Sequence, residues 1–246
     1  MTTTSSTTGT GHPPARRRRR WPWVLLAAAV VLGLLAVLVG PRVYARLQEG
    51  EAAAPLTTPG AASAATTPTA AATDPALEGT WAVTGGTAGY RVDEVLNGQD
   101  VTVTGRTDRV GGELTVQDGR LTAGTVTVDL AGVATDSGNR DAQFRRLLGV
   151  DANPTASFTL TAPVPLGGLD VGSALAVTLP GTLSIAGREQ AVEVPATVER
   201  TAAGEVTVTG AAPVTWADFG VQAPDLGFVS VEDTGTVEFA VTATPA

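Results

Sequence analysis

The chain of 246 residues contains no cysteine, no lysine and a single histidine, His12, which lies in a polar N-terminal stretch. Disulfides, Cys/His zinc sites and nucleophiles activated by histidine or cysteine are therefore excluded from the folded part. The adjacent acids Asp93-Glu94 and Glu232-Asp233 point to opposite faces of an extended strand, so neither pair converges on one substrate atom. We expect a protein that is not an enzyme and that needs no metal or cofactor.

Basic residues are few and unevenly placed. Residues 1–48 carry seven arginines and no acid, whereas the chain from Pro75 onward has 9 arginines against 21 aspartates and glutamates. Binding to a nucleic-acid backbone needs clustered basic side chains, which this acidic part lacks. The sequence therefore predicts no nucleic-acid partner.

Only one long hydrophobic run is present. Residues 1–20 form a polar tail, expected to be disordered, that ends in five arginines, and Trp21–Gly40 follows without a charged residue. Such a segment is long enough to span a bilayer, and the arginines predict that the N-terminus is cytoplasmic. We expect a single-pass membrane anchor with an extracytoplasmic C-terminal domain. A cleaved signal peptide remains the alternative, although its apolar region is usually shorter.

Residues 41–78 are rich in Ala, Thr, Pro and Gly, a composition that predicts a flexible linker without a core of its own. From residue 79 to 246, short apolar and polar alternations recur, separated by Gly, Asp or Asn, and threonine fills many of the polar positions. This pattern predicts an antiparallel sheet of about eight strands with one buried face, folded as a sandwich or closed as a barrel. Asp118-Gly119 is a tight-hairpin signal, and Pro180, Pro195 and Pro213 indicate strand edges or bulges. The clearest alternating runs are Leu175–Ile185, Val192–Val198, Val206–Trp216 and Val237–Val241.

One helix interrupts the strands, within Thr135–Phe158. Phe144, Leu147 and Leu148 share one helical face, the Asp136–Asn139 region offers capping side chains, and Gly149 ends the helix. Ala156, Phe158 and Leu160 then resume the two-residue period of a strand.

Several short motifs follow one another along the C-terminal domain: Trp81, Tyr90-Arg91-Val92, Thr135–Arg140-Asp141, Phe144–Leu148, Asn153-Pro154 through Phe158, Gly181 through Gly187 and Trp216 through Gly220. Their order resembles the YceI-like family, which consists of secreted, lipocalin-like proteins that bind polyisoprenoids. The resemblance covers about residues 78–244. Where members of that family often have a histidine, this chain has Asp93-Glu94.

The resemblance implies a mainly β fold, a single antiparallel lipocalin-like barrel with one short helix, whose apolar interior holds a polyisoprenoid, quinone or similar amphiphile. The alternative is a structural or interaction domain of the cell envelope, in which the same aromatic residues fill a solid core. Arg140-Asp141 predicts a local ion pair or helix cap. Arg145 and Arg146 are expected to be solvated, with contact to a head group at the mouth as the alternative. The candidate ligand-binding residues are Tyr90, Phe144, Phe158, Leu160, Trp216, Phe219, Phe228 and Phe239.

Overall fold

The computed structural model describes residues 53–56, 76–201, 204–225, 227 and 229–246. These residues all belong to one compact unit, Glu49–Ala246. The predicted membrane segment 21–40 lies outside the described residues, as does Phe228. Within the described part of the chain, no helix combines the length and the hydropathy that a membrane span requires.

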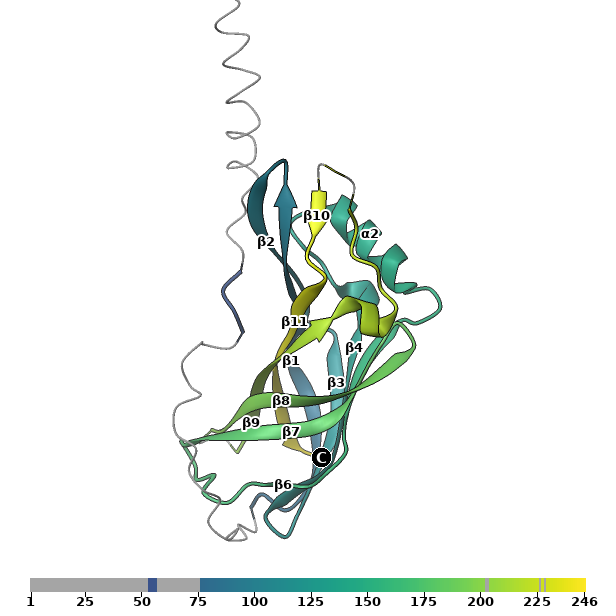
Figure 1. Ribbon diagram of the computed structural model, residues 1–246. Coiled ribbons are helices and arrows are strands. Elements are labelled where there is room, and N and C mark those ends of the chain that lie inside the picture. Colours follow the sequence, from purple (N-terminus) through teal and green to yellow (C-terminus); the bar gives the residue numbers. More distant parts are fainter. Residues whose placement is uncertain (1–52, 57–75, 202–203, 226, 228) are drawn as a thin grey trace, which may run out of the picture. The chain divides into compact units, whose positions relative to one another are not determined.

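The described chain forms a closed β-barrel with a helix at one end (Figure 1). The helical elements are the 3₁₀ turns η1 (Leu130–Gly132) and η2 (Trp216–Phe219) and the α-helix α2 (Gly138–Leu148). The strands are β1 (Gly79–Leu96), β2 (Gln99–Thr107), β3 (Val110–Gln117), β4 (Arg120–Asp129), β5 (Thr155–Leu160), β6 (Val164–Pro165), β7 (Ala174–Ile185), β8 (Arg188–Arg200), β9 (Val206–Thr215), β10 (Val229–Val231) and β11 (Thr234–Pro245).

Eight antiparallel strands close the barrel in the order β1-β11-β9-β8-β7-β5-β4-β3, and β3 pairs back with β1. The predicted lipocalin-like barrel of about eight strands is therefore confirmed. The predicted hairpin at Asp118-Gly119 joins β3 to β4, and both residues have positive φ, as a tight turn of this kind requires.

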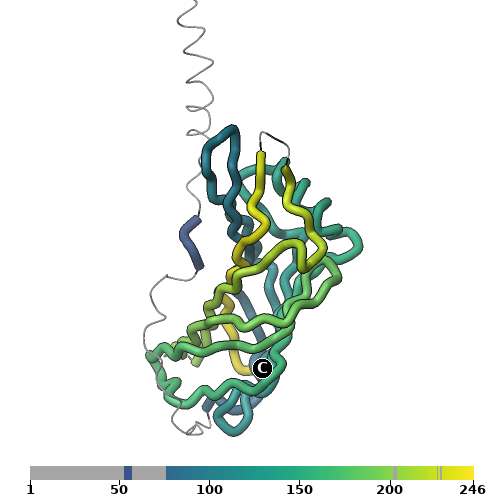
Figure 2. The backbone as a smooth tube through the Cα atoms, in the orientation of Figure 1, coloured from purple at the N-terminus to yellow at the C-terminus, as the bar shows by residue number. Residues whose placement is uncertain are grey.

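Strand β1 organises the barrel because it changes partners along its length. Its first part, up to Val83, pairs with β3, and its second part, from Ala88, pairs with β2. The change falls at Gly86, where φ is 134° and an added Cβ would lie 2.3 Å from the carbonyl oxygen of Ala240. β2 and β10 thus extend the wall beyond the closed barrel at the end that carries α2, as the tube in Figure 2 shows.

The three prolines within strands each lie where one ladder of hydrogen bonds stops. Pro180 pairs with β8 just beyond the last residue of β7 that pairs with β5. Pro195 pairs only with β7, and Pro213 pairs only with β11. The prediction of strand edges at these positions is confirmed, because proline cannot donate to a ladder on both sides.

Helix α2 begins after Ser137 and ends at Gly149, which adopts a left-handed conformation. The Ser137 side chain makes no capping hydrogen bond. Instead, Asp141 accepts hydrogen bonds from the backbone N–H of Thr135 at 2.8 Å and from its hydroxyl at 2.7 Å. Phe144 and Leu148 pack onto a small cluster of Leu130, Val133 and Val150, so the predicted apolar face of the helix meets the barrel.

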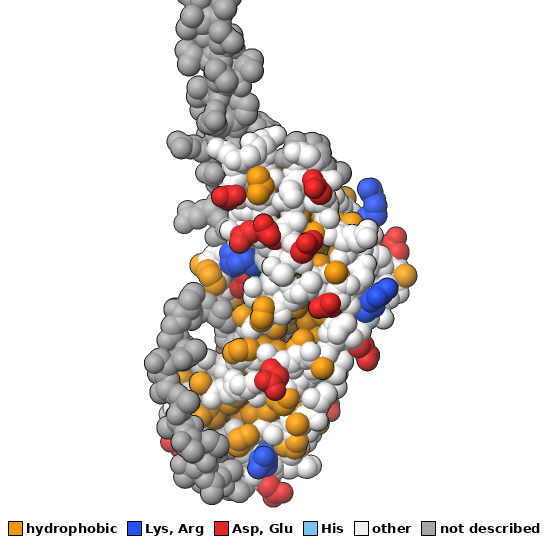
Figure 3. Space-filling model, in the orientation of Figure 1, with side chains coloured by type: hydrophobic (Ala, Val, Ile, Leu, Met, Phe, Trp, Pro, Cys, Tyr) orange, Lys and Arg blue, Asp and Glu red, His pale blue; other side chains and the backbone are white. Residues whose placement is uncertain are grey.

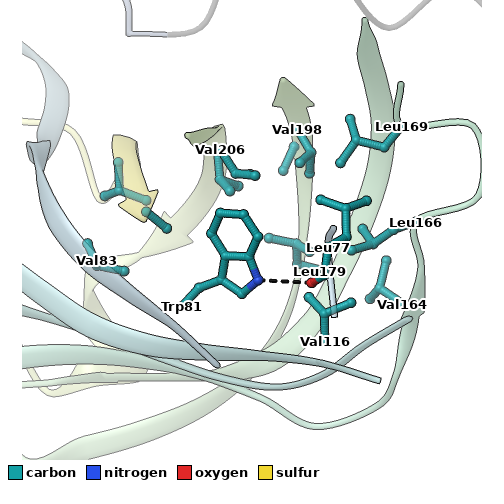
Figure 4. Packing of buried hydrophobic residues seen from close by; sticks show 14 of the residues in the cluster. Leu77, Trp81, Val83, Val116, Val164, Leu166, Leu169, Leu179, Val198 and Val206 are labelled. Carbon is teal, nitrogen blue, oxygen red and sulfur yellow. Dashed lines mark hydrogen bonds between the residues drawn. The ribbon is translucent and has the colours of Figure 1, made fainter. Parts of the chain in front are cut away.

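The opposite end of the barrel is closed by packed side chains. Trp81 is buried there, and its indole N–H donates to the carbonyl oxygen of Leu77 at 2.9 Å (Figure 4). Val164, Leu166 and Leu169, from the connection around β6, belong to the same cluster. One end of the barrel is therefore sealed.

Candidate ligand-binding cavity

The barrel interior is not filled: it holds a cavity of about 660 Å³. Because side chains alternate along a strand, each of the eight closing strands turns hydrophobic residues toward this space. The volume falls within the range typical of small-molecule sites. Residues that line it include Leu114, Val126, Phe158, Leu160, Leu183, Val208, Phe239 and Val241.

Six of the eight candidate ligand-binding residues line the cavity. Tyr90, Phe144 and Trp216 lie together toward the helix end: the Tyr90 and Phe144 rings stack at 5.1 Å, and Trp216 meets Tyr90 edge-on at 6.4 Å. Phe158, Leu160 and Phe239 line the cavity walls.

Phe219 and Trp216 do not lie where the sequence analysis placed them. Phe219 does not line the cavity: its side chain is packed against Leu183, Ile185 and Val214. Trp216 begins the 3₁₀ turn η2 and does not continue strand β9. The turn covers the wall where β8 and β9 no longer pair, and the Gln190 side-chain amide donates to the carbonyl oxygen of Asp218 at 2.9 Å. The Phe219 side chain therefore packs within the barrel wall and does not face the cavity.

The aromatic residues of the wall lie against glycines of neighbouring strands. Tyr90 pairs directly with Gly105, and Phe239 pairs directly with Gly210. An added Cβ would lie 2.3 Å from the Tyr90 ring, 2.2 Å from Phe158 at Gly181, 2.6 Å from Phe239 at Gly210 and 2.2 Å from Trp216 at Gly235. The rings thus occupy space that a Cβ would take, and they lie flat along the wall.

The cavity reaches the surface beside α2. Its solvent-exposed lining residues are Asn139, Gln143 and Leu147, all on α2, together with Gln222. Leu147 is 40% exposed, and among the described residues only Val171 is another large hydrophobic side chain with such exposure. We call this opening, formed by α2 and the Val221–Pro224 segment, the mouth.

An ion pair stands inside the mouth. Glu94, whose side chain is 7% exposed, lies 3.0 Å from Arg140, and both residues line the cavity. Arg140 also pairs with Asp136 one helical turn earlier. Burial raises the pKa of the neighbouring Tyr90 phenol to about 12, so this hydroxyl remains protonated at physiological pH.

The structure shows which of the charged residues considered in the sequence analysis line the cavity. Arg145 and Arg146 do not line the cavity, so Arg140 is the cation at the mouth. Asp93 and Glu94 point to opposite faces, as predicted: Asp93 is exposed and accepts a hydrogen bond from Thr102 at 2.6 Å. Sequence analysis missed the role of Glu94, although its parity with Tyr90 and Val92 along the strand was a usable signal.

No group of three or more His, Asp or Glu side chains within the described residues is placed to hold a metal ion. What the site offers is an apolar chamber, sealed at one end, with a few polar groups at the other.

An eight-stranded antiparallel barrel that is sealed at one end and encloses an apolar chamber defines the class of lipocalin-like barrels. Residues 82–243 match the family model of the YceI-like domain. The chain therefore belongs to the YceI-like family. No curated protein matches it.

One solved structure shares this fold, and two others are less similar to the chain. A polyisoprenoid binding domain from Saccharophagus degradans, implicated in plant cell wall breakdown, has a TM-score of 0.56 and 20% sequence identity, covering 68% of this chain and 98% of its own. BcnA from Burkholderia cenocepacia has a TM-score of 0.49 and 23% identity, covering 63% of this chain and 96% of its own. The YceI protein from Campylobacter jejuni has a TM-score of 0.45 and 16% identity, covering 56% of this chain and 81% of its own.

Proposed function

We propose that this protein binds a polyisoprenoid, quinone or similar long-chain amphiphile, with the apolar tail in the barrel and the polar end at the mouth. The observation that carries the proposal is the cavity of about 660 Å³, which is apolar along its walls and opens beside α2. A filled core, the alternative for an envelope domain without a ligand, would leave no such space. The description of the Saccharophagus degradans domain as polyisoprenoid binding supports the same ligand class.

The free energy of binding would come from the tail. Each CH₂ group removed from water contributes about 0.8 kcal/mol, so a long chain needs few polar contacts. The described chain provides few: the polar side chains at the mouth are those of Glu94 and Arg140 and the side-chain amides of Asn139, Gln143 and Gln222. Glu94 and Asp136 neutralise Arg140.

We further propose that the barrel acts outside the cytoplasm, held to the membrane by residues 21–40. The support is the uncharged run Trp21–Gly40 directly after five arginines. A cleaved signal peptide would place the same barrel in the same compartment without an anchor. Intact-mass measurement on protein from a membrane fraction separates the two, because a cleaved chain lacks the mass of the N-terminal segment.

Fluorescence titration tests the binding proposal. Trp216 lines the cavity near the mouth, so a quinone that enters should quench its emission, and polyprenol added afterwards should reverse the quenching by competition. Trp216→Phe identifies the signal near the mouth, and any quenching left in this variant reports on Trp81, which also lines the cavity. Trp21 and Trp23 serve as the internal background. Absence of saturable quenching by quinones of any chain length would contradict the proposal.

A further inference from the structure

A short piece of the linker lies against the outer wall of the barrel. Ala53–Leu56, twenty residues ahead of the first described residue of the barrel, makes three backbone contacts there. Arg91 donates to the carbonyl oxygen of Ala53 at 2.7 Å, and Arg106 donates to that of Ala54. The backbone N–H of Leu56 donates to a Glu238 carboxylate oxygen at 2.6 Å.

The three side chains that hold this segment come from adjacent strands. Arg106 on β2 and Glu238 on β11 both pair with Gly89 of β1, so they lie in one row across the wall. Gly89 has no side chain, and Arg106 reaches across it to within 3.6 Å of Glu238. Arg91, two residues along β1 on the same face, lies 3.2 Å from the other carboxylate oxygen. The row therefore forms a charged site against which residues 53–56 lie.

Glu238 is a buried carboxylate at the centre of this row. Its side chain is only 2% exposed when residues 53–56 lie against it. A carboxylate with so little solvent access needs partners, and the two guanidinium groups and the Leu56 N–H supply them. The two arginines leave an excess of one positive charge, and one terminal nitrogen of each donates to a backbone carbonyl oxygen of the segment.

We propose that Arg91, Arg106 and Glu238 form a docking site for the chain's own linker, in which residues 53–56 bind as a short extended peptide and clip the linker to the barrel wall. The site recognises backbone: two donors meet consecutive carbonyls and one acceptor meets an N–H. Pro55 suits this arrangement, since it fixes φ in the extended region and its missing N–H is not one that the site uses.

Docking changes the point from which the chain leaves the barrel. The site lies beside the second part of β1, which also carries Tyr90 and Glu94 of the mouth. If residues 41–78 act as a flexible tether, their end-to-end distance would be roughly 35 Å, whereas a tether of residues 41–52 alone would span roughly 20 Å. This consequence rests on the proposed membrane anchor; the docking itself does not.

The docking is tested by elastase cleavage after Ala53 in the full-length chain in detergent. Leu56→Pro removes the N–H that Glu238 accepts and leaves the barrel unchanged, while the matched control Leu56→Ala keeps it. Loss of a hydrogen bond to a charged group should make cleavage about tenfold faster in L56P than in wild type or L56A. Equal cleavage of L56P and L56A would overturn the proposal.

A second pair of variants tests the barrel side of the site. Arg106→Ala should release residues 53–56, measured as faster amide hydrogen exchange of Leu56, while Arg109→Ala should not. Arg109 follows the same strand and is an exposed arginine that pairs with Asp129 instead. Thermal melting confirms that both variants fold. A Leu56 amide that exchanges in wild type as fast as in an unstructured peptide would refute docking, and these readouts require neither ligand nor membrane.

Discussion

At the scale of single residues, the cavity depends on glycines as much as on aromatic side chains. Gly105, Gly181, Gly210 and Gly235 each lie under a ring of the wall, and a Cβ at any of them would overlap that ring. Stacking an aromatic ring on a cross-strand glycine covers the exposed backbone. Here it also keeps the rings along the wall and the chamber open.

Gly210→Ala should therefore shrink the cavity. The new Cβ would lie 2.6 Å from the Phe239 ring, which must turn toward the interior. Displacing about two methylene groups of a bound tail should weaken binding of the longest chains about tenfold. The measurement is quinone affinity as a function of chain length. The control is Gly111→Ala, whose Cβ meets nothing within 4 Å; equal losses in both variants would contradict the explanation.

The Tyr90 phenol provides a pH-dependent signal. Its folded pKa is raised to about 12 by burial, against about 10 in the unfolded chain. The folded protein thus holds a proton that the unfolded chain releases, so its contribution to stability is complete below pH 10 and is lost as the pH rises from 10 to 12. Ultraviolet titration of a Tyr44→Phe chain should show ionisation near pH 12 that shifts to near 10 in denaturant. Ionisation of the folded chain near pH 10 would contradict the burial of Tyr90.

The Glu94–Arg140 pair should contribute to stability. Glu94→Gln leaves Arg140 with Asp136 alone, and because Arg140 is partly exposed we expect a loss of about 1–2 kcal/mol in the free energy of unfolding. The neighbouring Asp93→Asn is the control, since Asp93 is exposed and should change stability by less than about 0.5 kcal/mol. Urea denaturation measures both. A loss as small in Glu94→Gln as in the control would show that the pair contributes nothing.

At the scale of elements, the sequence predicted the strands and the helix well because both have strong local signals. Alternating valines and leucines mark β7, β8, β9 and β11, and Asp118-Gly119 marks the β3–β4 turn. Trp216 continues the alternation of apolar and polar residues along β9, so only the tertiary structure shows that the strand ends before it.

The parts of the site that sequence analysis missed depend on contacts between distant elements. Glu94 and Arg140 are 46 residues apart, and each glycine–aromatic pair requires the strand register. The placement of Phe219 outside the cavity likewise depends on the gap between β8 and β9. Periodicity identifies which face a residue occupies, but it does not identify its partner.

Helix α2 should control entry to the cavity. Leu147→Asp places a charge on the exposed lining of the mouth, so the rate of quinone association should fall several-fold while stability changes by no more than about 0.5 kcal/mol. Arg146→Ala, one residue away on the same helix but outside the cavity lining, should leave the rate unchanged. Stopped-flow quenching measures the rates, and an unaffected rate in Leu147→Asp would place the entrance elsewhere.

At the scale of the whole molecule, the two ends of the barrel differ: one end is sealed around Trp81, and the other opens beside α2. Residues 53–56 are held on the wall of the part that carries the mouth. A protein that collects a lipid from a membrane benefits from such asymmetry, because the tail must enter through one end only.

If linker docking keeps the mouth near the membrane, Leu56→Pro should load quinone more slowly from vesicles in which the full chain is embedded. Its affinity for the same quinone in detergent should be unchanged, because the cavity is untouched. Leu56→Ala serves as the control for side-chain loss. Equal loading rates in all three proteins would show that docking does not affect lipid transfer. Whether residues 53–56 dock at all is decided by the cleavage test.

The central claim is that the cavity holds a long-chain amphiphile, and native mass spectrometry of the full chain purified from its own membranes tests it most directly. We predict a defined mass increment, consistent with one polyisoprenoid, quinone or similar lipid, that disappears on organic extraction and returns when the lipid is added back. A bare mass that stays unchanged after incubation with quinones and polyprenols would contradict the claim.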